Sequence, residues 1–378
     1  MGIIFLWNGG AISRDSFIGN LGVEIPDLSD DFKHYNIIGY VCFGLAAIFL
    51  ILILCCCKQI RLAVALCGLA GKFVASVCQV VFVPVIMAVF VIVLWVAAIF
   101  AMVGLIGGAT FVTNGNDVFT EIDSLTSNYL VMFYYYVFAT LWSNALLQAI
   151  AIFVIAATCA MWYFTHGLNQ PLDSPVRKSY WLAFRYHFGS LAFGSFILAL
   201  VEWIQFMVEV FSKQIEGCAD GNCCADCCMN CMRCCLECFK RCVECISRNA
   251  YIQMAIRGKG FCASSYDAVA MILTNPARYT ITTGLGEILM FITKLLVAGL
   301  TTFIFYLVIT FVTDVKQNIQ EPIYLLILVF IIGFTIAVIF MGVFSVSMET
   351  LLACFIFDEQ GNDKMKYGPA ELVDLMDT

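Results

Sequence analysis

Charged side chains inside long apolar runs are the residues of this sequence whose positions point most directly to chemistry. Glu202 lies in the middle of the apolar run 188–211, and Glu287 and Lys294 lie two helical turns apart in the run 284–312. Such a charge is costly in lipid unless it faces a partner or water. A carboxylate in this position can hold a cation or exchange it for a proton, and Glu202 is the strongest candidate. Ion pairs between helices are the alternative for all three charges.

A stripe of thiols is the second chemical signal. Seven cysteines alternate four and three residues apart, namely Cys224, Cys228, Cys231, Cys235, Cys238, Cys242 and Cys245. This spacing is one face of a helix, and charged residues fill other positions, so we expect an amphipathic helix with its thiols against the membrane surface or the bundle. The overlapping CxxC pairs allow a zinc site, which a continuous helix without histidine disfavours. Palmitoylation and, outside the cell, disulfides are further alternatives.

Catalytic constellations are not recognisable in the sequence. Its three histidines, His34, His166 and His187, are far apart and fit neither a catalytic triad nor a metalloprotease motif. No phosphate-binding loop is present either. The sequence therefore predicts a protein that is not an enzyme, with no cofactor and no bound metal.

The composition of the 378 residues identifies the solvent in which the candidate residues must work. Hydrophobic residues make up 62% and charged residues 12%, whereas soluble domains have roughly 45–50% apolar residues. Too few polar side chains exist to coat a water-facing surface, so the chain is predicted to be a polytopic integral membrane protein with lipid around it. Its 27 acidic and 20 basic residues form no long block, which argues against nucleic-acid binding.

Six long apolar regions are the elements that must position these residues. They are Asn36–Cys57, Leu62–Ala109, Leu130–Phe164, Phe188–Phe211, Gly284–Val312 and Pro322–Met348. The second is too long for one crossing and is interrupted by Lys72 and Pro84, so it is either two helices or an interfacial helix followed by a spanning one. We expect an all-α transmembrane bundle of about seven spanning segments.

The distribution of charge suggests which segments face the cytosol. The loop 110–128 is acidic, whereas the stretch 213–278 is basic, so the positive-inside rule places the loop outside and the cysteine-rich stretch in the cytosol. These two assignments depend on how often 62–109 crosses. The predicted segments are an N-terminal stub and polar loop (1–35), a first group of membrane helices (36–211), a cysteine-rich cytosolic segment (212–283), two last membrane helices (284–348) and a cytosolic tail (349–378).

A long run around the thiols resembles the signature of the choline transporter-like family. It reads CFKRCVECISRNAYIQMAIRGKGFCASSYDA (residues 238–268), and the resemblance extends to RYHFGSLAFGSF (185–196), GEILMFITKLLV (286–297) and TLLACF (350–355). Members of that family typically have about ten membrane helices. Relative to them, we expect this chain to be a shortened member that lacks the first helices and a large extracellular loop.

The resemblance implies transport of choline or a related organic cation. A trimethylammonium group is held by aromatic faces aided by a carboxylate, so Trp142 is expected to supply an aromatic wall and Glu202 a countercharge between two helices. The other candidate substrate-binding residues are Tyr135, Asn144, Gln148, Trp203 and Glu287. An interfacial belt is the alternative for Tyr135 and its neighbours. Facilitated diffusion or proton exchange is the expected mechanism. A non-transporting subunit of a larger membrane assembly, with partner subunits, is the alternative function.

Overall fold

The structure of the chain is a computed structural model that describes residues 41–44, 57–107, 126–166, 173–218, 223–311, 322–361 and 367. The chain divides into two compact units, residues 1–61 and 62–378. The packing between helices described below lies within the second unit.

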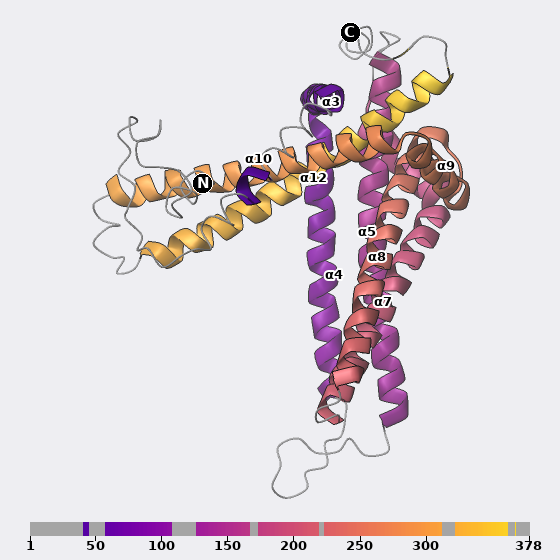
Figure 1. Cartoon of the computed structure of the whole chain (residues 1–378), viewed down its shortest axis with the longest axis vertical. Coiled ribbons are helices and arrows are strands. Elements are labelled where there is room, and N and C mark those ends of the chain that lie inside the picture. Colours follow the sequence, from indigo (N-terminus) through magenta and orange to yellow (C-terminus); the bar gives the residue numbers. More distant parts are fainter. Residues whose placement is uncertain are drawn as a thin grey trace, which may run out of the picture. The chain divides into compact units, whose positions relative to one another are not determined.

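Every regular element in the described part of the chain is a helix, which confirms the predicted all-α class (Figure 1). In chain order the elements are α3 (Cys57–Ser76), the short 3-10 helix η2 (Cys78–Val81), α4 (Phe82–Gly107), α5 (Thr126–His166), α6 (Pro175–Leu182), the π-helical turn η3 (Ala183–His187), α7 (Phe188–Cys218), α8 (Cys223–Arg257), α9 (Phe261–Thr274), α10 (Pro276–Phe311) and α12 (Pro322–Gly361).

Five stretches of helix are long and apolar enough to cross a membrane. They are Cys78–Leu105, Val131–Thr165, Pro175–Lys213, Pro276–Phe311 and Ile323–Gly361. Five of the six predicted apolar regions therefore contain such a helix, and the chain is a polytopic membrane bundle. The remaining region, Asn36–Cys57, lies mostly outside the described residues.

The long region 62–109 contains two helices, one of which is long and apolar enough to span. The break is at Val77, whose φ of -122° and ψ of 63° are not helical, so it falls between the two interruptions that the sequence suggested. Pro84 lies in the first turn of α4, where a missing backbone N–H breaks no helical hydrogen bond. Lys72 lies within α3. The chain thus uses α4 as the one long apolar helix of this region.

Helices α5, α7 and α8 lie side by side, with α7 antiparallel to both of the others (Figure 1). Trp142 of α5 contacts Ala192 near the start of α7, and Tyr134 of α5 contacts Trp203 farther along it. Glu202 of α7 pairs in turn with Lys240 of α8. Because α5 and α8 both run opposite to α7, their amino-terminal ends lie at the same end of the bundle.

The basic stretch 213–278 is therefore not a loop. Helix α8 extends along the bundle and contains most of this stretch. Arg233 lies beside the carboxyl end of α7, and Arg257, at the end of α8, follows the residues that pack against the amino end of α7. Gly194 near the start of α7 faces Tyr251 of α8 and Phe261 of α9, which fixes this register. The sequence predicted an amphipathic helix here but left open whether it lies against the membrane surface or the bundle, because that choice depends on packing with α5 and α7.

Helices α10 and α12 form an antiparallel pair, and α12 also contacts α4, α5 and α8 (Figure 1). Gly333 of α12 permits close approach, with Ala298 and Thr301 of α10 near the position that a β-carbon would occupy. Small residues at such crossings let apolar membrane helices pack closely.

Helix α5 forms the centre of the unit. In its most apolar stretch 67% of residues are buried, against 11–28% in the other four spans. Phe153 and Tyr163 of α5 pack with Phe73 of α3 and with Leu352 and Phe355 of α12 in one core cluster. The many apolar side chains left exposed on α4, α10 and α12 have the character of lipid-facing surface.

Candidate functional site

Four aromatic rings form a cluster between α5 and α7. Phe138 and Trp142 come from α5, and Phe196 and Trp203 come from α7. Their centroids are 5.6 Å apart for Phe138 and Phe196, 5.7 Å for Trp142 and Phe196, and 6.2 Å for Phe138 and Trp203, all in edge-to-face geometry. These distances and angles are those of favourable aromatic pairs. We call this group the α5–α7 aromatic cluster.

Both indole N–H groups of the cluster bind the backbone of the opposite helix. Nε1 of Trp142 donates to the carbonyl of Ala192 at 3.1 Å, and Nε1 of Trp203 donates to the carbonyl of Tyr134 at 3.2 Å. The two tryptophans therefore tie α5 and α7 together reciprocally. Their ring faces, rather than their N–H groups, are what remains for a cation.

A row of charged and polar side chains joins α7 to α8. It contains Glu202, Gln205, Glu209, Ser212 and Lys213 of α7, and Arg233, Glu237, Lys240, Arg241 and Glu244 of α8. We call it the α7–α8 polar seam. Since α7 is apolar enough to cross a membrane, ion pairs and hydrogen bonds within and between the two helices are what make these charges tolerable there.

Glu202 lies in this seam and faces α8. Its Oε1 is 3.7 Å from Nζ of Lys240, which is also 3.7 Å from Oε1 of Glu244. The Glu202 side chain is 23% exposed and the Lys240 side chain 25%, whereas Glu244 is 45% exposed. One ammonium is thus shared by a half-buried carboxylate of α7 and a more exposed carboxylate of α8.

A polar pocket of about 620 Å³ lies farther along the seam, toward the carboxyl end of α7. It is lined by Gln205, Val208, Glu209, Lys213, Arg233, Cys234, Leu236 and Glu237. Gln205 donates a 2.7 Å hydrogen bond to Glu237, and this bond, with that from Arg241, holds the pKa of the Glu237 carboxyl below its usual value. The volume is within the range of small-molecule sites, so the pocket can serve as a vestibule for a polar solute.

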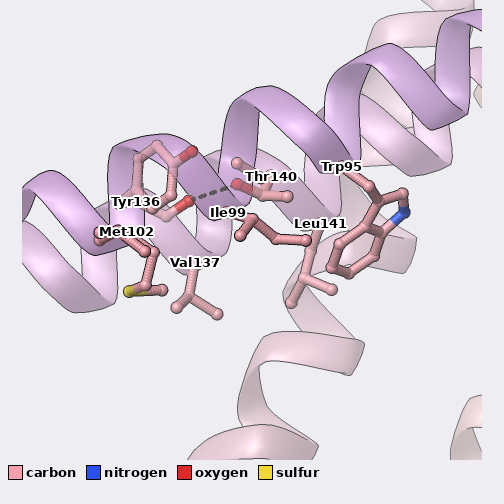
Figure 2. Close-up of a pocket in the computed structure, with 9 residues that line it drawn as sticks. Trp95, Ile99, Met102, Tyr136, Val137, Thr140 and Leu141 are labelled. Carbon is pink, nitrogen blue, oxygen red and sulfur yellow. Dashed lines mark hydrogen bonds between the residues drawn. The ribbon is translucent and has the colours of Figure 1, made fainter.

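A second hollow, between α4 and α5, is apolar (Figure 2). Its volume is about 220 Å³, and Trp95, Ile99 and Met102 of α4 face Tyr136 and Leu141 of α5 across it. The hydroxyl of Thr140 donates to the carbonyl of Tyr136 at 3.0 Å and is thereby satisfied (Figure 2). With no charge at its wall, this groove suits an apolar chain rather than a cation.

A buried ion pair between α8 and α12 is the polar centre that the sequence reading did not single out. Nε of Arg248 lies 2.7 Å from Oε2 of Glu349, whose side chain is 4% exposed, and Nη2 of Arg248 donates to Ser345 at 2.8 Å. Beside it, the Tyr279 hydroxyl of α10 donates to Asn249 at 2.6 Å. The available signal was Glu349 at the end of an apolar run, which has no partner nearby in the sequence.

Comparison with known proteins now decides the family. Residues 40–360 match the sequence profile of a family described as plasma-membrane choline transporters. The chain belongs to the choline transporter-like family. It is therefore an integral membrane protein of a transporter family, as its sequence predicted.

Several relatives within the family match this chain over part of their own length. The Drosophila melanogaster protein named choline transporter-like 2 is 31% identical over 236 residues, which are 61% of this chain and 28% of that protein. Danio rerio choline transporter-like protein 2 is 30% identical over 259 residues, which are 66% of this chain and 36% of that protein. Homo sapiens choline transporter-like protein 3 is 26% identical over 357 residues, which are 92% of this chain and 52% of that protein. The chain thus spans about half, or less, of the length of these relatives.

The predicted site residues of this family member do not all come together. Trp142 and Trp203 share the aromatic cluster, and Glu202 precedes Trp203 on α7 but faces α8. Trp142 contacts Ala192 and Phe196, six to ten residues before Glu202, which at ~1.5 Å per residue is about 9–15 Å along the helix.

The other predicted residues lie outside the cluster. Tyr135 is 73% exposed, and Gln148 and Glu287 are also exposed. Asn144 is half-buried on α5. The reason is helical geometry, because neighbouring positions on one helix point in different directions. Trp142 and Phe138, four residues apart, both contact α7.

The thiol stripe lies on the outer face of α8. Cys231, Cys235, Cys238, Cys242 and Cys245 are exposed and unbridged, while other faces of the helix pack on α5 and α7. In the described part of the chain no three metal-ligating side chains converge. The neighbouring thiol of Cys231 raises the pKa of Cys235.

Proposed function

We propose that this chain carries choline or a related organic cation across its membrane, by facilitated diffusion or in exchange for a proton. Membership of the choline transporter-like family supports the class of substrate. The observation that carries the proposal is that α7 carries, at consecutive positions, the half-buried carboxylate of Glu202, which faces α8, and Trp203 of the four-ring cluster, which faces α5.

Each part of this arrangement suits a quaternary ammonium ion. Such an ion cannot donate conventional hydrogen bonds, so it is attracted to aromatic faces and to negative charge. In the proposal Glu202 of α7 supplies the countercharge. Trp142 of α5 supplies an aromatic wall, at the level of Ala192 near the start of α7. The two are too far apart along the helix to hold one small ion together, so the cation meets them in succession.

The polar pocket gives this path an entrance. Its lining residues Gln205 and Glu237 lie next to Glu202 and Lys240 in the seam. A cation that enters the pocket would therefore pass Glu202 before it reaches the rings of Trp203 and Phe138.

Uptake of radiolabelled choline into vesicles that contain the purified chain tests the proposal. We expect saturable uptake that unlabelled choline suppresses, with vesicles lacking protein as the control. Flux that does not saturate, together with partner subunits that copurify, would instead favour an accessory role in a larger membrane assembly.

A further inference from the structure

The group formed by Glu202, Lys240 and Glu244 has one more negative than positive charge, so one further cation would neutralise it. Two carboxylates share one ammonium, at 3.7 Å each, so the three side chains carry a net charge of -1 when all are ionised. Elsewhere in the seam, Glu209 pairs with Lys213 and Glu237 pairs with Arg241, each with a cation four residues ahead on its own helix. The remaining cation of the seam, Arg233, contacts Ser212, ten residues beyond Glu202 on α7. Helix α5, which also packs here, has no Asp, Glu, Lys or Arg along its described length.

The two ion pairs of Lys240 differ in whether they join two helices or lie within one. Its contact with Glu244 is an i,i+4 pair within α8, which exists whatever α7 does. Its contact with Glu202 joins two helices and involves the less exposed carboxylate. A lysine has a flexible four-carbon stem and a compact charge, so Lys240 can release Glu202 and keep Glu244 without leaving either ion of α8 unpaired.

We propose that Lys240 is a tethered cation that occupies Glu202 in the empty protein and shifts to Glu244 when the transported cation binds. This inference rests on the proposed function. The incoming ammonium takes the place of the lysine ammonium at Glu202, and the group goes from a net charge of -1 to neutral. Glu202 is then paired at every stage, which avoids the cost of a lone charge in a half-buried seam. Lys240 thereby sets the affinity of the site, and neutral analogues of choline gain nothing there.

Two substitutions should act in opposite directions. Lys240→Gln removes the competitor, so choline should bind more tightly, by about 3- to 10-fold. Glu244→Gln removes the alternative partner, so Lys240 holds Glu202 more firmly and choline should bind about 3- to 10-fold more weakly. Lys240→Arg keeps the charge and should stay close to the unsubstituted protein. A role confined to packing would weaken or preserve binding in both variants and could not produce opposite signs.

Equilibrium binding of radiolabelled choline to the purified full chain, with KM and maximal uptake in vesicles, provides the measurement. Lys178→Gln is the matched control, because it breaks an exposed ion pair with Asp173 that lies outside the seam and the polar pocket. The KM should move while the maximal rate changes less. Glu244 is partly exposed, so its variant is expected to fold even if Lys240→Gln does not.

The outcomes separate the two proposals. If the unsubstituted chain neither binds nor moves choline, the proposed function fails, and the role of Lys240 fails with it. If it does bind choline, but the two variants shift affinity in the same direction or not at all, only the role of Lys240 is overturned, and the lysine is a structural bridge between helices.

Discussion

At the scale of single residues, Trp142 has two separable roles. Its ring can face a cation, and its N–H donates to Ala192 across the helix interface. Trp142→Leu removes both, whereas Trp142→Phe removes the hydrogen bond and keeps an aromatic face. We expect choline affinity to fall by about 2- to 30-fold in the leucine variant, equivalent to ~0.5–2 kcal/mol, and by less in the phenylalanine variant. Equal losses of affinity in the two variants would assign Trp142 to helix packing alone.

The pair of Arg248 and Glu349 is expected to be the ionic contact on which folding depends most. Arg248→Met would leave Glu349, at 4% exposure, as an uncompensated buried charge, so unfolding should become easier by about 3–5 kcal/mol. Thermal unfolding in detergent measures the effect. Glu209→Gln is the matched control. The side chains of Glu209 and its partner Lys213 are 60% and 71% exposed, so this pair should contribute less than about 1 kcal/mol to the free energy of unfolding.

The double variant sharpens this test. Replacing Glu349 as well, in Arg248→Met/Glu349→Met, removes the lone charge and should restore much of the lost stability. A loss in Arg248→Met no greater than that in Glu209→Gln would show that the buried pair is not needed to hold α12 against α8.

At the scale of elements, the start of α7 is held where α8 and α9 approach it most closely. A β-carbon on Gly194 would collide with the ring of Phe261 and would lie 2.8 Å from the hydroxyl of Tyr251. Gly194→Ala should therefore cost about 1–3 kcal/mol, because both rings are buried and cannot swing away. Gly189→Ala, in the same helix and with nothing within 4 Å of the added carbon, is the control. It should be neutral or slightly stabilising in the same thermal measurement.

At the scale of the whole molecule, the antiparallel arrangement of α7 constrains sidedness. The acidic loop precedes α5, and the thiol-rich half of α8 begins at the same end of the bundle, so an external loop and a cytosolic Cys231 cannot both hold. The opposite end carries Arg177, Arg185 and Arg257, and the positive-inside rule favours that end in the cytosol.

Labelling of the folded chain in sealed cells tests this constraint. An impermeant maleimide should label Cys231 from the outside, and an epitope inserted in the loop 110–125 should be detected from the same side. Labelling at alkaline pH helps for Cys235, because its raised pKa leaves a smaller fraction of reactive thiolate than an ordinary cysteine has at the same pH. Detection of the two sites on opposite faces of the membrane would contradict the antiparallel arrangement.

Composition and local pattern were sufficient to assign the class of the protein. A hydrophobic fraction of 62% and apolar runs of about twenty residues permit only a membrane bundle of helices, because lipid leaves backbone groups no partner outside a helix or a closed barrel. The run from Cys238 to Ala268 was long enough to indicate the family, which the match over residues 40–360 then established. These properties are local, since each is fixed by neighbouring residues along the chain.

The helix that each side chain faces is known only from the packed bundle. Glu202 and Trp203 are consecutive, yet one pairs with α8 and the other with α5, because successive residues on a helix point about 100° apart. Glu349 pairs with Arg248, 101 positions earlier in the chain, because α12 packs against α8. Helical periodicity defines the face on which a residue lies, but the partner of that face depends on packing between distant segments, and for this reason the shared lysine at Glu202 could not be read from the sequence.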